Sequence, residues 1–416
     1  MLAFMLLSTL RILGRRLPMT IAIILTGCGG GGTTSTEVAV VSTSGAVAPV
    51  PASTPTPPTA TPITPTPTPI PTPVSAAAPS LEGLAPVASG IDVKSLLGPA
   101  WSTGAIPDIE EQGVQGAFRF LCTPSHNAYN DPIVYPGQPG RSHLHTFFGN
   151  TKADADSTYQ SLRTTGESTC NNILNRSAYW IPAMMNGRSK VVMPDYVAIY
   201  YKRAPTGSVA CTFSPVKACL KLPRGLRYVF GYNMSSPSNS DPAWARYWNC
   251  DGPGAVPGHF ATIREAAAGC PIGARLGAVV IGPPCWNGKD LDSPDHRSHM
   301  AYPQDDHLGH SLCPATHPYI LPFFQLGAWY TNDGTAKDWF LSSDRMAGMP
   351  NMEPGTTLHA DWFGAWEDSA LDLWTANCID KSLSCSGGDL GNGQQMKLLA
   401  GYDYGNVTNL VDLPAQ

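Results

Sequence analysis

Two of the histidine stretches in this sequence alternate polar residues with one small or apolar residue. The first is His143-Leu144-His145, and the second is His359-Ala360-Asp361. In an extended segment, alternate side chains point to the same side of the backbone. We therefore expect His143 to point with His145, and His359 to point with Asp361.

Two further stretches combine imidazole and carboxylate groups. Residues 290–299 read DLDSPDHRSH and contain Asp292, Asp295, His296 and His299, and residues 313–318 read CPATHP and contain His317. If a helical turn begins at the proline of the first stretch, its two histidines share one face, with Asp292 near the N-terminus of the turn.

Imidazole and carboxylate groups at these spacings suit two kinds of chemistry. One is ligation of a divalent metal such as zinc or copper, for which His143, His145 and His296 are the candidate ligands. The other is general acid–base catalysis by a His–Asp pair without a metal. HExxH, GxSxG and P-loop motifs are absent from the sequence. Taken one at a time, each histidine is more often a structural or solvated residue, so the inference of a shared site rests on their clustering.

Tryptophan is the second signal, with ten residues, all from Trp101 onward. An indole beside a polar cleft offers a flat apolar face to a sugar ring and an N–H to a hydroxyl. Trp286, Trp362 and Trp366 adjoin the histidine stretches, so we expect these three to bind substrate. Packing in the core accounts for most of the others.

The sequence predicts that the elements that position these residues are mainly strands. Runs rich in Val, Ile, Tyr and Phe, bounded by Pro, Gly, Asn and Asp, predict strands at 116–122, 190–193, 196–202, 226–232, 278–281 and 320–329. Asn332-Asp333-Gly334 predicts a tight turn, and residues 260–268 predict a short helix that ends at Gly269. The expected fold is a mainly β, sandwich-like domain with long ordered loops and few short helices.

Cysteine usage predicts a disulfide-bonded domain. The sequence has 11 cysteines, and if Cys28 is lipidated the other ten form five disulfides, which suits an oxidising compartment. No CxxC occurs, which disfavours zinc-ribbon and thioredoxin-like sites. We expect the ten to pair in sequence order: 122 with 170, 211 with 219, 250 with 270, 285 with 313, and 378 with 385.

The first 80 residues have the features of an export and anchoring segment. Arg11, Arg15 and Arg16 precede the apolar run 17–25, which is too short to span a bilayer but suits a signal peptide. The next residues, Leu25-Thr26-Gly27-Cys28, resemble the lipobox of bacterial lipoproteins, in which the cysteine is diacylated. The alternative is a plain secretory signal that contains a cysteine.

A Gly/Ser-rich and then Pro/Thr-rich stretch follows Cys28 and predicts an unfolded stalk. Its proline-rich part, about 25 residues, could extend to roughly 75 Å as polyproline II. The alternative is a protease-sensitive spacer with no requirement for reach. We thus expect a signal peptide at 1–28, a stalk at 29–80 and one globular domain at 81–416.

The charge of the chain disfavours nucleic acid as a partner. The formal net charge is -5 and only 14% of residues are charged, which disfavours nucleic acid because phosphate binding needs a clustered basic surface. We expect a monomer that contacts the membrane through its lipid alone.

Five segments together resemble a secreted domain-of-unknown-function family found in filamentous fungi and bacteria, whose members often carry sugar-binding modules such as WSC or ricin-like domains. They are HLHTFFGN at 143–150, RSAYWIPAM at 176–184, LPRGLRYVFG at 222–231, CWNGKDLDSPDHRSHMAYP at 285–303 and CPATHPYILP at 313–322. The resemblance covers residues 110–380, implies an extracellular, carbohydrate-related role, and carries no established reaction. In that family a glycine stands where this chain has Ala360, which puts the aim of His359 and Asp361 in question.

These observations lead to one expected function and one alternative. The first is a surface-anchored hydrolase or lyase that acts on extracellular polysaccharide at a His/Asp site, with or without a metal. The alternative is a non-catalytic lipoprotein that binds surface glycan or wall polymer.

Overall fold

The computed structural model describes residues 80–100, 115–212, 219–305, 311–347, 350–404 and 409–415. The chain divides into two units, Met1–Thr72 and Pro73–Gln416, and the described residues all belong to the second. The predicted signal peptide, Cys28 and the stalk up to residue 79 lie outside them. No helix of the described part is long and apolar enough to cross a membrane.

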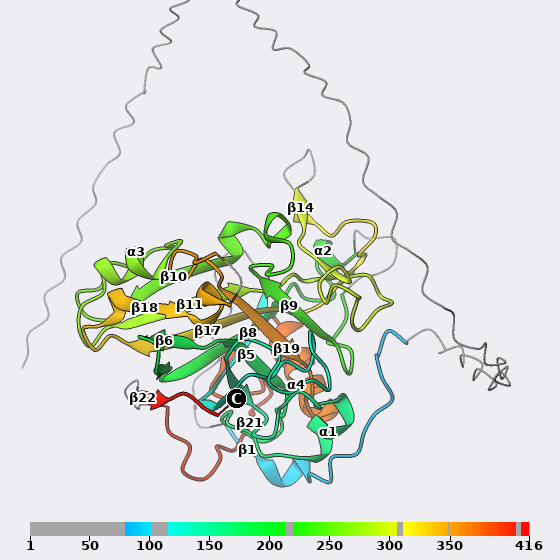
Figure 1. Ribbon diagram of the computed structural model, residues 1–416. Coiled ribbons are helices and arrows are strands. Elements are labelled where there is room, and N and C mark those ends of the chain that lie inside the picture. The colour runs from blue at the N-terminus through cyan, green and yellow to red at the C-terminus, as the bar shows by residue number, and fades with distance from the viewer. Residues whose placement is uncertain are drawn as a thin grey trace, which may run out of the picture. The chain divides into compact units, whose positions relative to one another are not determined.

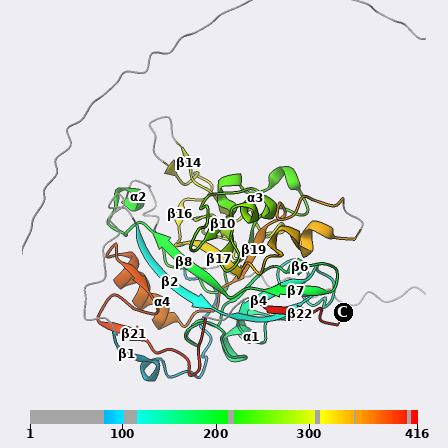
Figure 2. The same ribbon diagram turned by 90° about the vertical axis from the view of Figure 1, so that its left-hand side faces the viewer.

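The larger of the two main sheets has six strands, of which the first five form an antiparallel array. Its order is β10 (Arg246–Asp251), β11 (Arg275–Ile281), β17 (Phe323–Thr331), β8 (Tyr196–Arg203), β2 (Gly116–Cys122) and β20 (Ser384–Ser386). β20 pairs with β2 in parallel. Figure 2 shows β2 in cyan running beside β8 in green.

The second main sheet has five antiparallel strands. Its order is β3 (Pro124–Ala128), β4 (His145–Gly149), β5 (Ala178–Pro182), β19 (His359–Phe363) and β9 (Arg227–Gly231). In Figure 1, β19 is the orange strand that runs diagonally beside β9 and β5. Two of the histidine stretches therefore begin strands of one sheet.

Smaller sheets and short helices complete the described part. The remaining strands are β18 (Trp339–Leu341), β6 (Met184–Asn186), β7 (Lys190–Met193) and β22 (Asn409–Asp412) in one sheet; β13 (Met300–Ala301), β12 (Cys285–Trp286) and β16 (Tyr319–Ile320) in another; and the pairs β1 (Leu97–Pro99) with β21 (Gln394–Met396), and β14 (Gln304–Asp305) with β15 (Ser311–Leu312). The α-helices are α1 (Tyr159–Thr164), α2 (Val209–Thr212), α3 (Ile263–Ala268) and α4 (Asp368–Trp374). Single 3-10 turns are η1 (Val93–Leu96), η2 (Pro237–Asn239), η3 (Ala243–Ala245), η4 (Ala336–Asp338) and η5 (Ser342–Arg345), and η6 (Thr375–Ile379) is a π turn.

The core lies between the two main sheets. Phe324 of β17 contacts rings of three strands of the other sheet: Tyr179, stacked at a centroid distance of 5.6 Å, Phe230 at 5.3 Å and Trp362 at 5.4 Å. Inward-facing aromatic residues of both sheets thus interdigitate as in a sandwich. The prediction of a mainly β, sandwich-like fold is confirmed.

The strand and helix predictions are confirmed with small shifts of boundary. The predicted strands at 116–122 and 190–193 match β2 and β7, whereas the run 320–329 divides into β16 and β17 around Pro322. α3 begins at Ile263 rather than at Phe260 because Thr262 is its N-cap and forms a capping box with Glu265.

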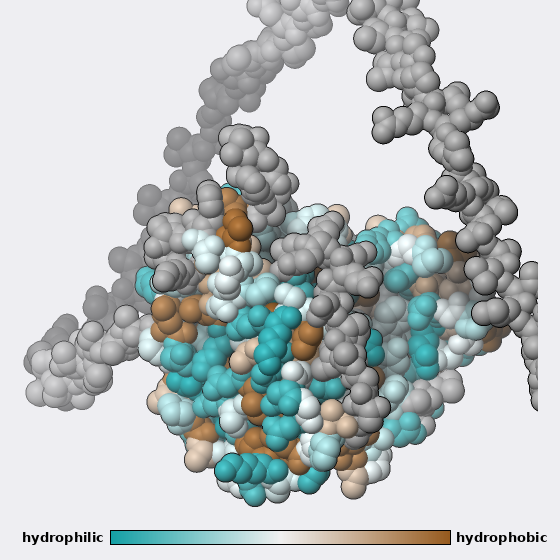
Figure 3. All heavy atoms as spheres, turned by 180° about the vertical axis from the view of Figure 1, so that it is seen from behind, coloured by the Kyte–Doolittle hydropathy of each residue, from teal (hydrophilic) through white to brown (hydrophobic). Residues whose placement is uncertain are grey.

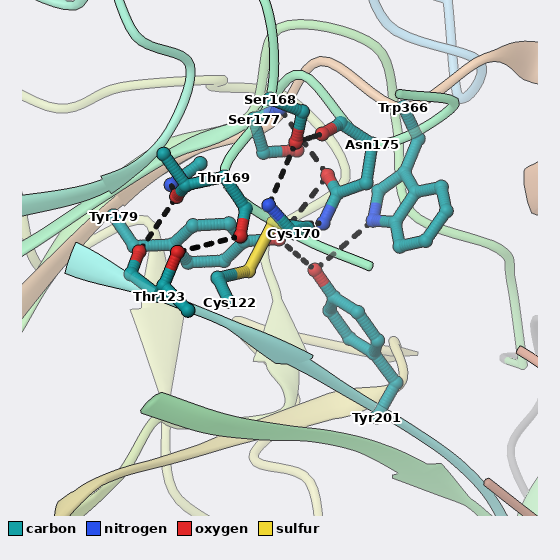
Figure 4. Close-up of a disulfide and its surroundings, with 11 residues drawn as sticks. Cys122, Thr123, Ser168, Thr169, Cys170, Asn175, Ser177, Tyr179, Tyr201 and Trp366 are labelled. Carbon is teal, nitrogen blue, oxygen red and sulfur yellow. Dashed lines mark hydrogen bonds between the residues drawn. A yellow bond between two sulfur atoms is a disulfide. The ribbon is translucent and has the colours of Figure 1, made fainter. Parts of the chain in front are cut away.

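All five predicted disulfides are present: Cys122–Cys170, Cys211–Cys219, Cys250–Cys270, Cys285–Cys313 and Cys378–Cys385. Figure 4 shows the first of them beside a buried polar network. In that network the Tyr179 hydroxyl lies 2.9 Å from the Tyr201 hydroxyl, which accepts a hydrogen bond from Trp366 Nε1 at 3.1 Å. The disulfide joins β2 of one main sheet to the loop that precedes β5 of the other.

The surface is mixed in polarity. Figure 3 shows one face on which hydrophilic residues are interspersed with small apolar groups. Scattered apolar residues of this kind are ordinary on protein surfaces.

Candidate functional site

Strand alternation places two histidines and an aspartate on the outer face of the five-stranded sheet. On β19, Ala360 packs in the core between the sheets, so His359 and Asp361 point the other way. With Ala360 at this position, His359 and Asp361 thus point to the same side of the strand, as the sequence predicts. On β4, Phe148 packs in the same core, and His145 again points outward.

Pairing through β5 brings the two histidine stretches together. His145 pairs with Pro182, and Asp361 pairs with Trp180, two residues earlier on the same strand. His359 and His145 consequently occupy the same end of the sheet, although they are far apart in sequence. His143 lies two residues before His145, just outside β4.

His143, His145 and His359 form a compact group, which we call the histidine cluster. Ring centroids are 4.1 Å apart for His143 and His145, 5.2 Å for His143 and His359, and 6.2 Å for His145 and His359. One ring nitrogen of each lies within 4.8 Å of one nitrogen of each of the others. Within the described residues this is the only group of three or more potential ligands that meets that distance.

Backbone carbonyls orient two of the three rings. Nδ1 of His145 lies 3.0 Å from the carbonyl oxygen of Asn130, and Nδ1 of His359 lies 2.8 Å from that of Thr357. A carbonyl can only accept, so Nδ1 carries the proton in each ring and Nε2 keeps its lone pair. Metal-binding histidines in proteins are held in the same way.

Nε2 of His145 and Nε2 of His143 are buried, and neither has a hydrogen-bond partner among the described residues. Buried polar atoms without a partner are uncommon and call for an explanation. Two unpaired imidazole nitrogens that face a third imidazole would be satisfied by one bound cation.

All three rings are neutral at pH 7. Burial, and the neighbouring His145 and His359, hold the pKa of His143 well below its usual value. Burial and His145 lower the pKa of His359 to about 3. Burial also lowers the pKa of His145, against the opposing effects of Asp131 and the hydrogen bond to Asn130. Neutral imidazole is the form that binds a metal.

Asp361 adds a buried carboxyl group beside the cluster. It is 1% exposed, and its Oδ2 atom has no hydrogen-bond partner among the described residues. Burial and the proximity of Asp131 raise the pKa of Asp361 well above its usual value, and Arg297 opposes this.

The cluster opens on a cavity of about 700 Å³, which we call the polar cavity. Its wall includes five of the residues that were predicted from the sequence: His143, Asp295, His296, His359 and Asp361. It also includes residues that were not predicted: Asp131, Asp241, Arg297 and Tyr302. Arg297 and Tyr302 lie within the 285–303 motif, so the sequence could have identified them as candidate site residues. Nothing in the sequence around Asp241 distinguishes it from other loop residues.

The predicted helical turn in residues 290–299 is wrong. His296 has a left-handed backbone conformation, with a φ of 58°, and the segment forms turns instead of a helix. As a result His296 and His299 do not share a face. His296 lies on the polar cavity with its Nδ1 atom 2.8 Å from Asp292 Oδ1, and Asp292 Oδ2 accepts a hydrogen bond from Arg227.

Two of the predicted site histidines have structural partners on both ring nitrogens. His299 is fully buried, with Nδ1 2.8 Å from Ser293 Oγ and Nε2 3.0 Å from the carbonyl oxygen of Arg227. The ring of His317 lies 2.9 Å from Thr316 Oγ1 and 2.9 Å from the carbonyl oxygen of Ser298. Neither lies on the wall of the polar cavity.

Asp295 organises the turn that carries His296. Its Oδ1 atom accepts hydrogen bonds from the Ser293 hydroxyl, the Ser298 hydroxyl, and the backbone N–H groups of Arg297 and Ser298. Partial burial would raise its pKa, but these donors outweigh burial and lower it. Asp295 is therefore an ionised structural acceptor at the edge of the cavity.

The packing of Trp286, Trp362 and Trp366 argues against the prediction that these three residues bind substrate. Their side chains are 0%, 1% and 5% exposed, because each packs in the core between or beside the main sheets. A fully packed indole has no free face for a sugar ring. His296, predicted as a third ligand beside His143 and His145, is not a member of the histidine cluster, whose third member is His359.

Comparison with known proteins identifies one family. A family model described as "Domain of unknown function (DUF1996)" matches residues 131–366. This range contains the whole histidine cluster and the described wall of the polar cavity. No curated protein and no solved structure matches the chain.

Proposed function

The chain belongs to the DUF1996 family, and from the geometry of its histidine cluster we propose that it is an extracellular, metal-dependent hydrolase that acts on polysaccharide. The observation that carries the proposal is the convergence of three neutral imidazoles, two of which have unpaired buried Nε2 atoms, at a polar cavity whose wall includes His143 and His359.

The residues of the cluster fit a zinc site of the catalytic kind. Three histidines and an open fourth position form a known set of zinc ligands, and copper binds similar sets. A bound metal of this kind lowers the pKa of a coordinated water to about 7 and polarises a substrate oxygen. In the proposed site, the Asn130 and Thr357 carbonyls hold two ligand rings in place, and Asp361 lies where it can hydrogen-bond to a bound water or a sugar hydroxyl.

The charges on the cavity wall favour hydrolysis over elimination. Lyases that act on polyuronates need cationic groups to bind the substrate carboxylates. Arg297 is the only lysine or arginine on the described wall of the polar cavity, and its guanidinium donates to the carbonyl oxygens of Gly231 and Tyr232. We therefore propose a neutral or amino-sugar polymer as substrate.

The location of the activity follows from the N-terminal segment. The lipobox-like residues before Cys28, the even set of ten paired cysteines and the Pro/Thr-rich stretch support an exported protein that is anchored by lipid on a stalk. A tethered domain is suited to a large insoluble polymer. The proposed location is the outer face of a membrane.

Metal content is the first test. The full chain, purified without chelator and analysed for zinc and copper, should contain about one equivalent of metal, and His145→Ala and His359→Ala should each lose it. His317→Ala is the matched control, because its ring is bound to Thr316 and Ser298 on the surface, and it should keep its metal. A metal-free wild type that also fails to take up added zinc or copper would contradict the proposal.

Turnover is the second test. The metal-loaded chain should release reducing ends from at least one of a varied set of polysaccharides, and His359→Ala should release none although it remains folded. Retention on a polymer without any product would favour the non-catalytic, glycan-binding lipoprotein instead. An unsaturated product would identify a lyase.

A further inference from the structure

Trp244 is the most exposed tryptophan among the described residues. Its side chain is 57% exposed, whereas Trp329 is partly buried and the others are buried. Exposing an indole leaves a large apolar surface in water, which is unfavourable unless a ligand covers it. We propose that Trp244 is the platform on which sugar units stack when a polysaccharide chain extends beyond the polar cavity; this inference rests on the proposed function.

Trp244 contacts Tyr302, a residue that lines the polar cavity. It lies in the single turn η3, which follows Pro242, and its ring meets Tyr302 edge-on at a centroid distance of 5.3 Å. The Tyr302 hydroxyl is itself fixed, at 3.1 Å from Asp241 Oδ2 and 2.5 Å from the carbonyl oxygen of Ile281. An indole side chain has only two torsions, so it loses little conformational entropy when a ligand binds.

Tyr302 also separates the polar cavity from a second one. The second cavity, of about 820 Å³, is lined by Tyr302, Trp244, Ile281, Pro284 and Phe323 among other mainly apolar residues. Because Tyr302 lines both cavities, a chain that leaves the histidine cluster across this ring reaches Trp244 directly.

The composition of the second cavity suits a pyranose chain. The C–H faces of a pyranose ring pack on aromatic and proline rings, and its hydroxyl groups need polar partners at the edge. Lys202 and Gln325 also line this cavity and are 3.5 Å apart, between Nζ and Oε1. The walls thus combine apolar surface with polar groups that can bind sugar hydroxyls.

The test measures affinity for the polymer, which does not require turnover. Affinity gel electrophoresis of the full chain gives the dissociation constant for the polysaccharide that wild type binds best. This constant should rise about tenfold in Trp244→Ala. Trp244→Phe should recover most of the lost affinity. Tyr404→Ala is the matched control, because Tyr404 is 48% exposed and lines neither cavity. It should bind as wild type does.

Each outcome separates the stacking platform from the proposed function. If wild type and Trp244→Ala bind with equal affinity, the proposal of a stacking platform is wrong and the hydrolase proposal is unaffected. Weaker binding by Trp244→Ala in a chain without turnover supports the platform and overturns the hydrolase. A wild type that neither binds nor cleaves any polysaccharide overturns both. Metal content of Trp244→Ala should equal that of wild type, which shows that the fold at the cluster is intact.

Discussion

The backbone conformation of one residue determines which histidines of the 290–299 segment reach the cavity. His296 has a φ of 58°, which turns its ring outward, while His299 points into the core. The spacing of the two histidines predicted a shared helical face, because spacing alone cannot reveal a left-handed residue. A non-glycine residue rarely adopts this conformation. Sequence patterns therefore identified the segment and misassigned its side chains.

The burial of His299 predicts a pH dependence of stability. Burial lowers its pKa from 6.5 to about 4, against the opposing effects of Asp292 and its hydrogen bond to Arg227. As pH falls below 6.5 the unfolded chain binds a proton at this residue and the folded chain does not, so stability falls until the pH reaches about 4. The loss from this residue should be about 3 kcal/mol.

Replacement of His299 by glutamine, which does not titrate, should remove this loss. The measurement is the free energy of unfolding by urea between pH 7 and pH 4, with disulfides intact and chelator present so that metal release does not contribute. The stability difference between wild type and His299→Gln should shrink by about 3 kcal/mol as pH falls. A difference that stays constant across this range would contradict the assignment.

At the scale of elements, the two alternating stretches were the most predictable part of the site. His143 with His145, and His359 with Asp361, lie on one side of the backbone as the period of a strand requires. Their association was not predictable, because it depends on the order β4, β5, β19 in the sheet, and strand order involves residues distant in sequence. The same strand order explains why His359, and not His296, is the third member of the histidine cluster.

Gly231 at the end of β9 is required for this arrangement. It pairs with His359, has a φ of 100°, and a Cβ atom added to it would lie 2.7 Å from the Cα atom of His359. Gly231→Ala should therefore displace β19 at the histidine cluster, lower the free energy of unfolding by roughly 3 kcal/mol and reduce metal content.

The matched control for that variant is Gly187→Ala. Gly187 also has a positive φ, of 67°, but a Cβ atom there would have no neighbour within 4 Å. Gly187→Ala should lower the free energy of unfolding only by the backbone strain, about 1 to 2 kcal/mol. It should leave the metal content unchanged. Equal metal content in the two variants would show that the cluster does not depend on the approach of β9 to β19.

For the whole molecule, the disulfides were predictable and the roles of the tryptophans were not. Pairing in sequence order follows if neighbouring cysteines close local loops, and all five loops obey it. The burial of Trp286, Trp362 and Trp366 depends on how two sheets pack, which proximity to histidines in sequence does not reveal. Trp244, the exposed one, has no histidine within ten positions of it.

The proposed lipid anchor belongs to the scale of the whole chain and can be tested apart from the site. Diacylation of Cys28 would supply two acyl chains, which suffice for stable membrane attachment because each buried CH₂ contributes about 0.8 kcal/mol. Wild type should partition into the detergent phase of Triton X-114 and incorporate labelled fatty acid, and Cys28→Ser should move to the aqueous phase without label. Because Cys28 lies in the unit Met1–Thr72 and the histidine cluster in the unit Pro73–Gln416, the aqueous variant should keep wild-type metal content. If Cys28→Ser remains in the detergent phase, attachment does not depend on this cysteine, and the proposal of a lipid anchor at Cys28 is wrong.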